Sequence, residues 1–99
     1  IVPTADVIID EVCKFYNIDT DALRGQGRTK DISLARQIAM YQIRSMTNLS
    51  LKEIGKEFDG RDHTTVLHSI DRIEKMVKND PDIKEIIKDI TANINIRYE

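Results

Sequence analysis

The apolar residues of this chain recur at helical spacing from one end to the other, and nowhere does a strand-like alternation persist. The clearest stripe has the i, i+4, i+7, i+11 spacing of one helix face and consists of Val66, Ile70, Ile73 and Val77. The length of 99 residues suits one small domain. The pattern therefore predicts an all-α, compact helical domain of about five to six helices.

Turn and capping residues divide this pattern into helices. We expect an amphipathic, linker-type helix within residues 1–16, beginning near Thr4, and a helix-turn-helix domain over 17–99. In the first helix the inward residues are Ile8, Val12 and Phe15. A turn and a short helical piece over 17–23 and a loop over 24–31 precede a helix over 33–47, with Ser33 as its N-cap. The inward residues of that helix are Ile38, Ala39, Ile43 and Met46.

The two helices that follow are joined by a short turn. Residues 50–58, SLKEIGKEF, open with a capping box, in which Ser50 is the N-cap and Glu53 lies three residues on. Gly60 marks the turn, and Asp62 caps a helix over 62–78. Two helices around a Gly-containing turn are typical of a helix-turn-helix. A last helix begins at NDPDI, residues 79–83, and runs to about residue 97.

The second helix of this pair starts with the polar residues Asp62, His63, Thr64 and Thr65. In a helix-turn-helix these first residues meet base edges in the DNA major groove. A carboxylate accepts from base amino groups, and threonine offers a methyl to thymine or a hydroxyl to a base. Singly, each residue has a plainer role, since Asp62 caps the helix with or without DNA. Together, at the one place where readout occurs, they predict DNA binding.

The charge distribution supports this prediction better than the net charge of −2 does. Residues 24–52 carry six basic side chains against one acidic side chain, between two acidic ends. Such asymmetry is typical of a one-faced anion-binding surface. Arg61 suits a phosphate, and His68 and Lys75 lie opposite the apolar stripe, where they would reach the DNA backbone.

The sequence carries no pattern of an enzyme, a metal site or a membrane span. It has no phosphate-binding GxxxxGK[ST] and no CxxC, and His63 and His68 are five residues apart, on different sides of a helix. Cys13 is alone at an apolar helix position, which predicts a buried structural thiol. No apolar run approaches the ~20 residues of a membrane-spanning helix.

GRDHTTVLH, residues 60–68, resembles the sequence hallmark of the C-terminal DNA-binding domain (domain IV) of the bacterial chromosomal replication initiator DnaA. ARQIAMY, residues 35–41, and MTNLSLKEIG, residues 46–55, are similar to that domain too. The resemblance implies a cytoplasmic, nucleoid-associated domain that binds DnaA boxes, consensus TTATNCACA, as a monomer at the replication origin. It also implies transcriptional regulation through the same boxes. ATP and other initiator subunits would be bound by upstream domains, with no cofactor in this chain.

The resemblance also implies two classes of DNA contact, carried over by position. Base contacts would come from the major-groove residues Asp62, His63, Thr64 and Thr65 and, in the minor groove, from Arg28. Phosphate contacts would come from Arg36, Gln37, Arg44, Leu51, Lys52, Arg61 and His68. For Leu51 and Lys52 the donors would be backbone N–H groups, since a helix N-terminus has free donors and positive potential.

Some positions depart from the family pattern. Ala35 and Lys52 stand where the family usually has Pro, and Asp59 stands where it usually has Gly. The loop at 24–31 is less basic than in many relatives, because Gly25, Gln26, Gly27 and Asp31 occupy it. Because phosphate neutralisation dominates affinity, we expect weaker binding than in more basic relatives.

A function of another class is a helical protein-interaction module, whose surface would be the acidic last helix with Asp82, Glu85 and Asp89. Acidic phospholipid is a weaker alternative partner, bound by the amphipathic first helix. Residues 1–23 carry five acidic side chains and one basic side chain, which disfavours a lipid surface.

Overall fold

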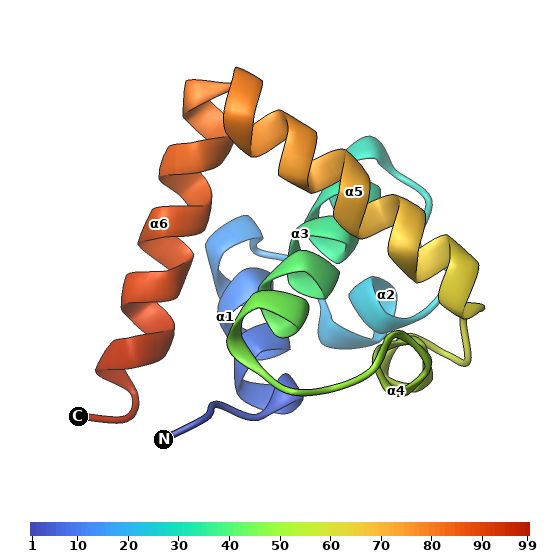
Figure 1. The fold of residues 1–99 in the computed structure, drawn as a ribbon, viewed down its shortest axis with the longest axis horizontal. Coiled ribbons are helices and arrows are strands. Elements are labelled where there is room, and N and C mark those ends of the chain that lie inside the picture. The colour runs from blue at the N-terminus through green and yellow to red at the C-terminus, as the bar shows by residue number, and fades with distance from the viewer.

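Six helices and no strand make up the computed structural model, which describes residues 1–99 (Figure 1). In chain order they are α1 (Ala5–Tyr16), α2 (Thr20–Arg24), α3 (Lys30–Met46), α4 (Leu51–Glu57), α5 (His63–Asn79) and α6 (Pro81–Ile96). The prediction of an all-α domain with five to six helices is confirmed. No helix combines the length and the apolar character needed to cross a membrane.

Helix α3 lies at the centre of the fold and contacts each of the other five helices (Figure 1). Its Ala35, Ile38, Ala39 and Ile43 are fully buried, whereas Met46 is half-buried at the edge of the core. Helix α6 runs back from the end of α5 and brings the two termini close together (Figure 1). The backbone N–H of Thr4 donates to the Tyr98 hydroxyl at 3.1 Å, so this contact joins the two ends of the chain.

The core is a single cluster of 17 buried residues, aliphatic apart from Phe58, Cys13 and Met40. Burial raises the pKa of the Cys13 thiol, which therefore stays protonated at neutral pH and packs as a small apolar side chain. On α5 the predicted stripe faces this core: Val66, Ile70 and Ile73 are buried, and Val77 is half-buried against it.

Three of the predicted helix caps are confirmed. Ser50 and Glu53 form both hydrogen bonds of the capping box at the start of α4. The carboxylate of Asp62 caps α5, and Asp80 caps α6 with Pro81 in its first turn. Each cap depends on residues two or three positions apart, which is why the sequence alone reveals it.

Two predictions about the first half of the chain are wrong. Phe15 is 41% exposed, and Tyr16 packs against the core in its place. The buried face of α1 is centred on Ile8, Ile9 and Val12, and Tyr16 lies closer to this face than Phe15 does. Helix α3 begins at Lys30, with Thr29 as its N-cap in place of Ser33. Its first turn lacks the apolar periodicity on which the prediction relied.

Helix α1 packs against α2, α3 and α6 and contributes to the common core. The division into a linker-type helix at 1–16 and a domain at 17–99 stays a prediction. In this structure the two stretches share one core.

Candidate nucleic-acid interface

Helices α4 and α5 and the connection at 58–62 form the helix-turn-helix. The connection passes very close to α4 at Gly55, which has no side chain. The Gly55 carbonyl accepts from Phe58 N at 3.1 Å and from Arg61 N at 3.0 Å. A Cβ at this position would lie 2.1 Å from the Arg61 carbonyl oxygen. Asp59 and Gly60 turn the chain with φ of 62° and 69°. Asp is one of the few side chains that tolerate this left-handed region, which explains how it replaces a Gly.

The predicted base-reading residues lie together at the exposed N-terminus of α5. Asp62 Oδ2 accepts from Thr64 N at 3.2 Å, and Asp62 Oδ1 lies 3.4 Å from His63 Nδ1. The side chains of Asp62 and His63 are each 64% exposed. Thr64 and Thr65 are exposed too. The four side chains thus offer acceptors, donors and methyl groups at one helix end, with no cover from the rest of the chain.

A polar hollow with no apolar lining residue lies next to this helix end, between α4 and α5. It is lined by Lys52, Lys56, Gly60, Arg61, Asp62 and His63. Both lysines are exposed and neither forms an ion pair, so their charges are available to an anion. Lys56 lies one helical turn after Lys52, a spacing from which sequence reasoning could have found it.

The loop between α2 and α3 carries Arg28, which is exposed and makes no hydrogen bond or ion pair within the chain. Its neighbour Arg24 behaves differently, because it pairs with Asp6 at 2.6 Å and Glu57 at 3.1 Å. Of these two arginines, only Arg28 has its charge uncompensated by a neighbouring carboxylate.

Two residues predicted to hold phosphates are engaged inside the protein. Arg36 is only 8% exposed, and its guanidinium donates to the carbonyls of Leu23, Ala22 and Gly27. Arg61 is half-buried and donates to the carbonyl of Arg24, the last residue of α2, and to that of Gly25, the next residue. Burial lowers the pKa of the Arg36 guanidinium, and the nearby charge of Arg61 acts in the same direction. Arginine nevertheless stays protonated in proteins.

The remaining predicted phosphate residues surround the helix-turn-helix. Arg44 and His68 are exposed, and Gln37 is half-buried. The side-chain oxygen Oε1 of Gln37 accepts from Arg72 Nη1 at 2.9 Å. This hydrogen bond brings a further exposed cation, Arg72, next to Gln37. Sequence reasoning missed Arg72, although it lies one turn after His68 on α5. At the start of α4, Leu51 is half-buried and Lys52 exposed.

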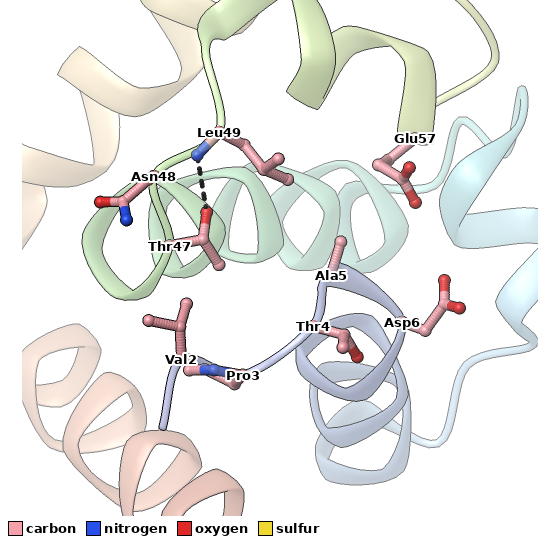
Figure 2. A pocket seen from close by; sticks show the side chains of 9 residues that line it. All are labelled: Val2, Pro3, Thr4, Ala5, Asp6, Thr47, Asn48, Leu49 and Glu57. Atoms are coloured by element: carbon pink, nitrogen blue, oxygen red, sulfur yellow. Dashed lines mark hydrogen bonds between the residues drawn. The ribbon is translucent and has the colours of Figure 1, made fainter.

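A separate pocket lies between the N-terminal segment and the connection from α3 to α4 (Figure 2). None of the residues predicted to contact DNA lines it. Its two carboxylates, Asp6 and Glu57, both accept hydrogen bonds from Arg24. No group of His, Cys, Asp and Glu side chains in the protein has the arrangement of a metal site.

Comparison with known proteins places this geometry in a family. The family model described as the bacterial DnaA protein helix-turn-helix matches residues 5–73. A chromosomal replication initiator protein DnaA from Crocosphaera subtropica is 45% identical over 96 residues, which cover 97% of this chain and 21% of the relative. The DnaA protein of Limosilactobacillus fermentum is 53% identical over 77 residues, which cover 78% of this chain and 18% of the relative.

A solved structure shows the same fold. The crystal structure of a DNA replication initiation factor matches with a TM-score of 0.79 and 31% identity, over 91% of this chain and 28% of that chain. This chain spans about a fifth of the length of the two curated relatives. On the family model and these identities, the chain belongs to the bacterial DnaA helix-turn-helix family.

Proposed function

We propose that this chain binds double-stranded DNA sequence-specifically, as the origin-binding part of a chromosomal replication initiator. The observation that carries the proposal is the exposed cluster Asp62–Thr65 at the N-terminus of α5, the second helix of the helix-turn-helix. The B-DNA major groove admits an α-helix, and these residue types match its base-edge donors, acceptors and methyl groups. The sequence bound is the DnaA box, consensus TTATNCACA, with one monomer on each box.

The contacts fall into two groups with different consequences. Asp62, His63, Thr64 and Thr65 read bases in the major groove, and Arg28 enters the neighbouring minor groove, whose negative potential attracts arginine. Phosphates are held around them by exposed cations and polar groups. In this group we place Lys52, Lys56, Arg72, Arg44, His68, Gln37 and the backbone N–H groups of Leu51 and Lys52.

The proposal also covers the rest of a full-length initiator, since this chain spans only about a fifth of the length of the DnaA relatives. ATP binding and assembly with other initiator subunits would belong to segments outside this chain. Binding at DnaA boxes near promoters would also give the protein a role in transcriptional regulation. No observation on the acidic face of α6 favours the protein-interaction module over DNA binding.

The first experiment is fluorescence anisotropy of this chain with a labelled duplex containing TTATCCACA, against a scrambled duplex of equal composition, at one stated salt concentration. We expect the box to bind about 10³-fold or more tightly than the scrambled duplex, as specific sites do. Affinity should also fall steeply with salt, by a log–log slope of about −0.9 for each phosphate neutralised. Equal, weak binding to both duplexes would contradict the proposal.

Two variants separate base readout from phosphate contact. Thr64→Ala should cost about 1–3 kcal/mol on the box and little on the scrambled duplex, since it removes a base contact. Lys52→Ala should weaken both duplexes alike and reduce the salt slope by about 1. Lys88→Ala, an exposed lysine of α6, is the matched control and should change neither. The division of roles fails if Thr64→Ala and Lys52→Ala give the same pattern.

A further inference from the structure

A guanidinium group of α3 joins the end of α2 to the loop between α2 and α3. Arg36 Nε donates to Leu23 O at 2.7 Å, and Arg36 Nη2 donates to Ala22 O at 3.1 Å and to Gly27 O at 2.9 Å. Three of its five N–H donors are thus taken by backbone carbonyls, and Arg36 is only 8% exposed. One side chain thus connects the last turn of α2 to Gly27, the residue before Arg28.

A second guanidinium joins the same loop to the helix-turn-helix. Arg61 Nη2 donates to Gly25 O at 2.6 Å, and Arg61 Nη1 donates to Arg24 O and to Phe58 O, both at 3.0 Å. Phe58 lies in the connection between α4 and α5, and Gly60, two residues later, turns the chain. The bonds therefore link the connection that leads into α5 directly to the loop that carries Arg28.

Neither arginine has a carboxylate partner, in contrast to Arg24 with Asp6 and Glu57. Their acceptors are backbone carbonyls only. Arginine suits this arrangement, because its guanidinium presents five donors in a rigid planar fork, whereas lysine carries a compact point charge on a flexible stem. The loop itself is tightly folded, since a Cβ on Gly27 would lie 2.8 Å from Ile32 Cγ2 and 2.9 Å from Ala22 O.

We propose that Arg36 and Arg61 are positioning residues that hold the loop at 25–29 in one place relative to the start of α5. Through them, Arg28 meets the DNA in register with Asp62–Thr65. The inference rests on the proposed DNA binding, and it replaces direct phosphate contact as the role of these two arginines. A loop ordered before binding loses less conformational entropy when the complex forms, which favours affinity.

The first test uses the free protein and involves no DNA. In Arg36→Lys the positive charge stays but the fork is lost. We expect ¹⁵N order parameters at residues 26–28 to fall from about 0.85, typical of rigid backbone, to below about 0.6. Arg97→Lys is the matched control, because Arg97 also donates to two partners, Asp10 and Glu11, on α1. Unchanged order at residues 26–28 in Arg36→Lys would overturn the inference.

The second test measures binding to the TTATCCACA duplex. Arg36→Lys should bind about tenfold or more weakly, with the salt slope of the parent chain, because no phosphate contact is lost. Its effect should be largely absent in the Arg28→Ala background, since it acts through Arg28. If Arg36 contacted a DNA phosphate directly, the result would differ. Arg36→Lys would then keep most of the affinity, and Arg36→Ala would reduce the salt slope by about 1.

The outcomes separate the inference from the proposed function. If the parent chain does not prefer the box, DNA recognition fails, while the order parameters still decide whether the arginines hold the loop. If the parent prefers the box and Arg36→Lys loses loop order without losing affinity, the positioning role is wrong. Where Arg36→Lys does not fold, as judged by circular dichroism, the half-buried Arg61→Lys takes its place in both tests.

Discussion

At the residue scale, Asp62 combines a structural role with the recognition role that we propose for it. Its Oδ2 caps α5 by accepting from Thr64 N, and its Oδ1 lies beside His63. The cap uses one oxygen, and the side chain is still 64% exposed, so further acceptor sites face solvent. One carboxylate can therefore serve both the helix cap and the proposed base recognition.

Substitutions at Asp62 can separate these two roles. Asp62→Asn keeps a good N-cap, so the free energy of unfolding should change by less than about 0.5 kcal/mol, whereas Asp62→Ala should lose about 1 kcal/mol. Both should alter the preference among boxes changed at single positions, because Asn adds an amide donor and Ala removes the acceptor. Urea unfolding and anisotropy measure the two effects. Asp62 would be a cap alone if Asp62→Asn kept the base preference of the parent chain.

At the element scale, the approach of α4 to the connection before α5 depends on Gly55. Its backbone carbonyl accepts two N–H groups of the connection, and no room is left for a side chain. Gly60 is different, since a Cβ there would meet nothing within 4 Å, and only its φ of 69° disfavours other residues.

Gly55→Ala should therefore destabilise the protein by about 3 kcal/mol or more, because a backbone carbonyl must move to admit the methyl group. Gly60→Ala should cost about 1–2 kcal/mol, the strain of the left-handed backbone. Urea unfolding measures both. We further expect folded Gly55→Ala protein to bind the box more weakly, since α5 shifts against α4. An equal cost for the two variants would contradict the close approach at Gly55.

The capping box of α4 predicts a pH dependence. Hydrogen bonds from the backbone and side chain of Ser50 lower the pKa of Glu53 below its ordinary value of 4.5. A depressed folded-state pKa means that the stabilisation is fully present above pH 4.5 and is lost as pH falls through the folded pKa. Glu53→Gln keeps a capping acceptor without this titration. The difference in unfolding free energy between parent and variant should therefore shrink from pH 7 to pH 3, and a constant difference would contradict it.

At the scale of the whole molecule, α6 supports the fold from outside the stretch matched by the family, which ends at residue 73. It buries Ile83, Ile90 and Ile94, the last two completely. It is also tied to α3, where the buried Gln42 Nε2 donates to Ile87 O at 3.1 Å and to Thr91 Oγ1 at 3.2 Å. The helix-turn-helix therefore depends on a helix that does not belong to it.

Truncation after Asn79 should remove about 5 kcal/mol or more, given about 1.5–3 kcal/mol for each buried Ile side chain. That loss is comparable to the total stability of a small domain. We expect the truncated chain to lose cooperative thermal unfolding by circular dichroism, and box binding with it. Truncation after Tyr98 is the control and should change little, because it removes only the exposed Glu99 and its backbone hydrogen bond to Ile96 O. If the chain truncated after Asn79 still unfolded cooperatively, the helix-turn-helix would not depend on α6.

The sequence was informative about features that depend on neighbours along the chain. The helical class, the α4–α5 pair and the caps at Ser50, Asp62 and Asp80 all follow from spacings of two to four residues. The sequence spacing did not show that Tyr16 faces the core and Phe15 does not. Both lie near the edge of the apolar face of α1, and only the packing of α3 and α6 against α1 selects one.

For the candidate site, the sequence by itself determined the chemistry at the start of α5, because a cap and a first turn are local. Only the tertiary structure decided what the arginines contact. Arg36 and Arg61 have the same charge as Arg28, but all of their acceptors except Phe58 O lie 9 to 37 positions away in the chain. Such contacts form only when α3 and the α4–α5 connection pack around the loop, so burial separates positioning arginines from exposed ones in a way that no sequence spacing records.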